Sequence, residues 1–116
     1  KHLNIREMGL ERFSALAHEN GMVIFQAHPF RNQMTVMNPA LLDGVEVHNG
    51  NPRHDSRNDI ARMWAEKFDK KMSSGSDYHQ VEDIARGGIV TQEPVYDAAG
   101  LVDVLMSGKA ELIEEI

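Results

Sequence analysis

The chain has 116 residues, of which 41% are hydrophobic and 26% charged, and it contains no cysteine. These values are typical of one globular domain and exclude disulfides and thiolate metal sites. The formal net charge of −6 argues against nonspecific binding to nucleic acid, which needs a basic surface. No apolar run approaches the ~20 residues of a membrane span, and no signal peptide opens the sequence. We therefore expect a single domain over residues 1–116, located in the cytoplasm.

Helix and strand patterns alternate along the chain. Apolar residues at helical spacing predict three helices, at residues 4–19, 55–70 and 98–107. Asp55 or Ser56 is expected to cap the second helix, and Asp97 the third. Short apolar runs bounded by turn residues predict five strands, at residues 22–26, 44–48, 71–74, 87–90 and 110–113.

This alternation favours an α/β fold with a largely parallel sheet. The first strand, residues 22–26, has the continuous apolar run of a strand buried on both faces. The second helix is expected to face the core through a stripe formed by Ile60, Met63, Trp64 and Phe68, with Ala61 and Ala65 close by. The order of elements suggests the C-terminal part of an α/β barrel, with an open sheet as the alternative.

Asp77 and His79 follow the third predicted strand. In extended chain, residues two apart point to the same side, so a carboxylate and an imidazole would face one cavity. Gly75, just before them, allows close approach of the backbone. The alternative is an ordinary loop in which Asp77 caps the next turn.

His28 and His48 also stand at the ends of predicted strands. In parallel α/β folds, reactive groups gather at the carboxyl ends of the strands. His28, His48 and the Asp77/His79 pair would then meet at one edge of the sheet. A structural, hydrogen-bonded role is the alternative for each histidine.

Glu46 and His48 form a second pair two residues apart and would share one side of their strand, with Asn49 on the other side. A buried Glu46 needs a partner, which could be the backbone or an arginine. Arg31 and Arg53 follow strand ends and could bind a phosphate through a planar, bidentate guanidinium. For Arg53 a solvated side chain is an equal alternative.

Taken in order, these motifs resemble the later motifs of the PHP (polymerase and histidinol phosphatase) domain. The likeness covers roughly residues 20–90. It rests on Ala27-His28-Pro29 with Arg31, on Gly44-Val45-Glu46-Val47 with Asn49, and on Gly75-Ser76-Asp77 with His79.

The resemblance implies the C-terminal portion of a distorted (β/α)7 barrel that holds two or three divalent metals (zinc, manganese or iron) and hydrolyses a small phosphorylated substrate. His28, Asp77 and His79 would be metal ligands. Asp77 would also orient the attacking water, and Arg31 would stabilise the substrate phosphate during catalysis. The substrate would further contact His48 and Arg53, and the ligands would be supported from behind by Glu46 and Asn49.

The family's earlier motifs, which include a His-x-His pair, do not occur in these 116 residues. The resemblance therefore implies a C-terminal half, with little or no activity alone. Unpaired sheet edges would favour self-association or pairing with an N-terminal half. Two other functions stay open, namely a PHP-type nuclease and a non-catalytic α/β assembly module.

Overall fold

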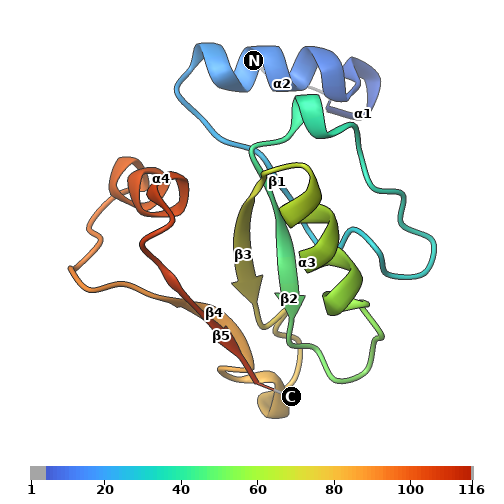
Figure 1. Cartoon of the computed structure of the whole chain (residues 1–116), viewed down its shortest axis with the longest axis vertical. Helices are drawn as coiled ribbons and strands as arrows, with labels where there is room; N and C mark the ends of the chain where they lie inside the picture. Colours follow the sequence, from blue (N-terminus) through green and yellow to red (C-terminus); the bar gives the residue numbers. More distant parts are fainter. Residues whose placement is uncertain (1–4, 116) are drawn as a thin grey trace.

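The structure is a computed structural model that describes residues 5–115. Within these residues, no helix is long and apolar enough to cross a membrane. The elements follow one another in this order: α1 Ile5–Met8, α2 Leu10–Glu19, β1 Phe25–Gln26, η1 Pro39–Leu41, β2 Gly44–Asn49, α3 Asn58–Lys67, β3 Lys71–Gly75, η2 Val81–Asp83, β4 Gly87–Val90, α4 Ala98–Ser107 and β5 Glu111–Glu114 (Figure 1).

Strands β1, β2 and β3 form a parallel sheet in that order, which confirms the α/β class. Figure 1 shows α3 beside β2, with β4, β5 and α4 beyond β3. The last two strands depart from the expected parallel sheet, because β4 and β5 pair antiparallel in a sheet of their own. The described residues close no barrel, so the expected barrel remains a proposal.

The β4–β5 pair is fastened to β3 through one side chain instead of a backbone ladder. Ser74 Oγ donates to the carbonyl of Ile113 and accepts from the amide of Gly88. Next to it, a Cβ added at Gly87 would lie 2.2 Å from the carbonyl oxygen of Gly75. The two chains can approach this closely only because residue 87 has no side chain.

Gly9 divides the predicted first helix in two. Its φ of 79° is left-handed, a conformation that costs glycine little, and its carbonyl accepts the amide of Phe13. The helix therefore stops after Met8 and restarts at Leu10. Residue 4, the predicted first residue, lies outside the described residues.

The core lies between α3 and the parallel sheet. Its buried members are Leu42, Val45, Val47 and Ala65, with Leu10, Ile24, Trp64, Met72 and Leu112 packed around them.

The predicted apolar stripe of α3 was wrong in part. Trp64 packs against the core as expected, but Ile60, Met63 and Phe68 are 42%, 68% and 41% exposed. The buried residues of the helix are Ala61 and Ala65, whose small side chains let the helix lie close to β2.

The expected burial of strand 22–26 on both faces was also wrong. Only Phe25–Gln26 pairs as a strand, and both residues are half-buried. Met22 is 60% exposed. Within residues 5–115, β1 pairs with β2 alone, so it lies at an edge of the sheet and has no second strand beside it.

The start of α3 differs from both predicted caps. The helix begins at Asn58, after Arg57 in a left-handed conformation (φ 49°, ψ 54°). Asp55 Oδ1 accepts the amide of Arg57, one residue before the helix. Ser56 binds an arginine instead, as described below. The cap of α4 was predicted correctly, since Asp97 Oδ1 accepts the amide of Gly100 at 2.7 Å.

Candidate functional site

Three loops leave the parallel sheet at the same edge, because β1, β2 and β3 run in one direction. The loop after β1 meets the loop after β3 through a hydrogen bond from Arg31 to Asp77. The loop after β2 meets the same residue through Asn51 Nδ2, which donates to the carbonyl of Asp77 at 3.2 Å. The two places that the sequence analysis singled out, around His28 and around Asp77, therefore lie in adjoining loops.

The side chain of Asp77 is held by Arg31. Arg31 Nη2 donates to Asp77 Oδ2 at 3.0 Å, and the two side chains are 14% and 21% exposed. Ser56 Oγ accepts from Nε and Nη2 of the same arginine at 3.2 and 3.0 Å. Burial alone would raise the pKa of Asp77, but the hydrogen bond and charge of Arg31, helped by Asn49 and His79, outweigh burial and lower the pKa. Asp77 is therefore a carboxylate at neutral pH.

His79 lies against Asp77 in a tight turn. Asp77 has a φ of 51°, which departs from extended chain and folds His79 back over it. His79 Nδ1 lies 2.8 Å from the carbonyl oxygen of Asp77 and 3.6 Å from its Oδ1. The imidazole is 68% exposed. The predicted Asp77/His79 pair thus forms, through a turn and not through the extended spacing that predicted it.

His28 has an unusual environment at the start of the loop that follows β1. Its φ is 29°, and its amide donates to Glu46 Oε1 at 2.9 Å. Its Nδ1 is buried and makes no hydrogen bond within the described residues. Glu46 thus has the backbone partner that was one of its two expected alternatives.

A β-bulge changes which side chains share a face of β2. Glu46 pairs with Ser73 but His48 pairs with Ser74, so one extra residue of β2 is accommodated between them. Paired residues of parallel strands point to the same side, and Ser73 and Ser74 point to opposite sides. The expectation that Glu46 and His48 share one side was therefore wrong, as was the placement of Asn49 on the other. Asn49 Nδ2 in fact donates to Glu46 Oε1 at 2.9 Å.

His48 and Arg53, both predicted to contact substrate, have protein partners. His48 is 7% exposed, and its Nε2 lies 3.0 Å from the carbonyl oxygen of Arg86. Arg53 donates from both terminal nitrogens to Asp83, at 2.9 and 2.6 Å. Contact of either residue with a substrate stays a prediction.

Asp83, Asn51 and Ser56, which hold these loops together, are not among the site residues predicted from the sequence. Asp83 is 0% exposed. The Arg53 guanidinium is the main cause of a pKa for Asp83 far below the usual range, with the amides of His79 and Gln80 contributing. Asp83 lies three residues after Gln80, which is the spacing of a capping box, and the structure contains this capping box. That spacing was the available signal for Asp83. The other two residues gave no comparable signal.

The described residues contain no group of three or more His, Cys, Asp or Glu side chains placed to hold a metal ion. His28, Asp77 and His79 therefore do not converge on one point. The three residues lie in adjoining loops. Whether they bind different metal ions, as the resemblance implies, is taken up below as a proposal.

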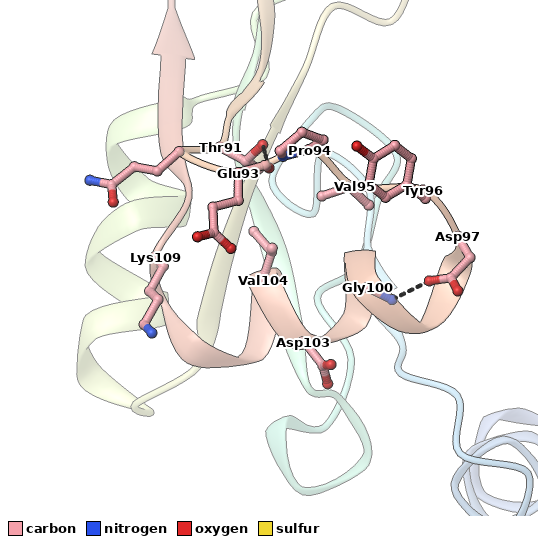
Figure 2. Close-up of a pocket in the computed structure, with 11 residues that line it drawn as sticks. Thr91, Glu93, Pro94, Val95, Tyr96, Asp97, Gly100, Asp103, Val104 and Lys109 are labelled. Carbon is pink, nitrogen blue, oxygen red and sulfur yellow. Dashed lines mark hydrogen bonds between the residues drawn. The ribbon is translucent and has the colours of Figure 1, made fainter.

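A separate hollow of about 430 Å³ lies between α4 and the loop before it (Figure 2). It is lined in part by Glu93, Tyr96, Asp103 and Lys109. None of the site residues predicted from the sequence lines this hollow. The strand-end loops, which carry the predicted residues, therefore remain the candidate site.

Part of the chain matches a known protein family. Residues 55–110 match the PHP_C family model, described as PHP-associated. The matched segment runs from the residues before α3 to residue 110, just before β5, and includes Asp77, His79 and Asp83, but not His28 or Arg31. The chain matches none of the curated proteins and none of the solved structures with which it was compared. The match covers 56 of the 116 residues, and it confirms the expected resemblance of this chain to the C-terminal part of PHP proteins.

Proposed function

We propose that this chain supplies part of the active site of a metal-dependent phosphoesterase of the PHP type. The observation that carries the proposal is the meeting of three strand-end loops at one edge of a parallel sheet, within a chain that has a PHP-associated region. These loops carry His28, Asp77 and His79, the residue types that bind zinc, manganese or iron.

One feature of the chain supports a metal at this edge. A buried imidazole nitrogen without a partner costs free energy, and His28 Nδ1 is such an atom. A metal ion would give it the partner that it lacks. Bound metals would lower the pKa of a coordinated water and supply hydroxide near neutral pH.

The donor set of the described residues is too small to complete that site. No three donors converge, and Asp77 Oδ2 is occupied by Arg31. The resemblance assigns the remaining donors to motifs that these 116 residues do not contain. We therefore expect the chain alone to show little or no turnover, and we derive no reaction step from it.

The first test measures hydrolysis of para-nitrophenyl phosphate by the 116-residue chain with added Mn²⁺ or Zn²⁺. Background rates are expected. Robust turnover that depends on the metal would show that these residues suffice alone. That result would contradict the proposal that the chain supplies only part of the active site.

The second test uses the complete protein and elemental analysis. We expect bound metal and phosphatase activity, both lost in His28→Ala and both kept in His54→Ala, a matched change at an exposed histidine. Loss of neither property in His28→Ala would remove His28 from the site. Complete absence of metal would favour the non-catalytic module, which the lack of three converging donors also fits.

The proposed substrate is a small phosphate ester. The net charge of −6 favours it over a polynucleotide. Parallel assays with a panel of small esters and with single-stranded DNA decide between them. Faster cleavage of the DNA would replace the phosphatase with a nuclease.

A further inference from the structure

Asp83 is a buried carboxylate with four hydrogen bonds. Arg53 donates to both of its oxygens, at 2.9 and 2.6 Å. The backbone amides of His79 and Gln80 donate to Oδ2 at 2.8 and 2.9 Å. Its side chain is 0% exposed, so it is out of reach of the solvent. The carboxylate therefore acts on the loop that carries His79, fixing its backbone at two consecutive amides.

The other side of the same loop is fixed by Asn51. This residue is 4% exposed, and its Nδ2 donates to the carbonyl of Asp77. Its Oδ1 accepts the amide of Arg53 at 3.0 Å. Asn51 and Arg53 both lie in the loop after β2, so this loop holds the backbone on both sides of Tyr78.

The contacts of Asp83 and Asn51 hold the backbone around His79 and thereby determine which nitrogen of the His79 ring carries the hydrogen. A carbonyl oxygen only accepts hydrogen bonds, and the carbonyl of Asp77 lies 2.8 Å from His79 Nδ1. The hydrogen must then sit on Nδ1. The second neighbour of Nδ1, Asp77 Oδ1 at 3.6 Å, is also an acceptor. The lone pair is left on Nε2, the nitrogen that would face an incoming ligand, since the ring is 68% exposed.

We propose that Asp83, held by Arg53, is a positioning residue that keeps His79 in the Nδ1–H tautomer with Nε2 ready to bind a metal ion. The part of this proposal that concerns metal binding rests on the proposed function. The tautomer of His79 and its dependence on Asp83 are independent of that function. An imidazole in water prefers the hydrogen on Nε2, so the fold imposes the opposite form by holding the carbonyl of Asp77 against the ring.

The test is ¹⁵N NMR of the histidine side chains at about pH 8, where an ordinary imidazole is neutral. In the unchanged chain, His79 is expected to show a hydrogen-bearing Nδ1 and an acceptor-like Nε2. Asp83→Asn removes the charge that holds Arg53 and weakens the bonds to both amides. We expect the hydrogen to move to Nε2 in most molecules, as in a solvated imidazole.

Glu82→Gln is the matched control, because it also removes one negative charge from η2, one residue away, at an exposed side chain. It is expected to leave the His79 signals unchanged. Arg53→Lys serves if Asp83→Asn does not fold, since lysine keeps the charge but cannot donate to both oxygens in a planar fork. It should give a smaller shift in the same direction.

Two results would overturn the proposal. One is a hydrogen on Nε2 of His79 in the unchanged chain. The other is an unaltered Nδ1–H form in the folded variant, whether Asp83→Asn or Arg53→Lys. In the complete protein, Asp83→Asn should also weaken zinc binding by about 10–100-fold. If the tautomer responds as expected and the complete protein binds no zinc, the proposed function fails while the positioning role stands.

Discussion

The carboxylate of Glu46 is expected to contribute strongly to stability, although it is only half-buried. Its Oε1 accepts one hydrogen bond from the amide of His28 and one from Asn49, both at 2.9 Å. It thereby ties the end of β1 to the bulged end of β2. Hydrogen bonds to a charged group contribute about 1.5–3 kcal/mol each. At the lower value for two partly exposed bonds, Glu46→Ala should reduce the free energy of unfolding by about 3 kcal/mol.

Urea unfolding followed by circular dichroism measures this change. With a slope of about 2 kcal/mol per molar for a chain of this size, the midpoint should fall by about 1.5 M. Glu66→Ala is the matched control, since it makes the same substitution at an exposed helical position, and it should stay within about 0.5 kcal/mol of the unchanged chain. Glu46→Gln keeps the acceptor oxygen and should lose about half as much as Glu46→Ala.

Equal midpoints for Glu46→Ala and Glu66→Ala would refute the reasoning. Such a result would mean that the bulge and the conformation of His28 persist without the carboxylate. The two bonds to Glu46 would then be consequences of the local backbone geometry and not its cause.

Three further predictions concern the rest of the fold. Gly87→Ala places a Cβ 2.2 Å from the carbonyl oxygen of Gly75, so we expect urea unfolding to show a loss of about 1–3 kcal/mol, and an unchanged midpoint would contradict the packing of β4 on β3. Because the pKa of Asp83 is lowered in the folded state, its contribution is present above the ordinary carboxyl pKa of about 4 and is lost as the pH falls below it. Melting temperatures should therefore drop more steeply between about pH 5 and pH 3 in the unchanged chain than in Asp83→Asn, and equal slopes would contradict the prediction. Asp97→Ala removes the hydrogen bond to the amide of Gly100 and should cost about 1 kcal/mol in the same urea assay, whereas no change would mean that α4 is held by packing alone.

Local signals predicted the elements that depend on local physics. The third helix was predicted residue for residue, because Asp97 caps it and Gly108 follows its last residue. The central strand was predicted to within one residue, since turn chemistry bounds both ends of its apolar run. The gathering of His28 and Asp77 at one edge followed from the parallel order of the strands.

Features that depend on pairing between distant segments could not be predicted in this way. The bulge in β2 arises from the register against β3, and no residue type within β2 predicts it. It reversed the expected sides of His48 and Asn49. The exposure of Met63, beside a buried Ala61, reflects how close α3 lies to the sheet, which a hydrophobic pattern does not encode. Residue spacing indicates the direction in which a side chain leaves the backbone, but it does not indicate which residue of a neighbouring segment that side chain contacts.

The partners of the candidate residues divide them into two kinds. Arg53, Glu46 and His48 have polar partners in the fold, and those bonds tie one segment of the chain to another. His28 Nδ1 is buried with no partner in the described residues, and Nε2 of His79 is left without hydrogen by the bond at Nδ1. An unsatisfied buried nitrogen lowers the free energy of unfolding by about 1–3 kcal/mol, and a fold that needed only stability would remove it. The nitrogen that this fold leaves unsatisfied belongs to the loop that the PHP resemblance assigns to metal binding, which is the strongest physical reason to look for a metal there.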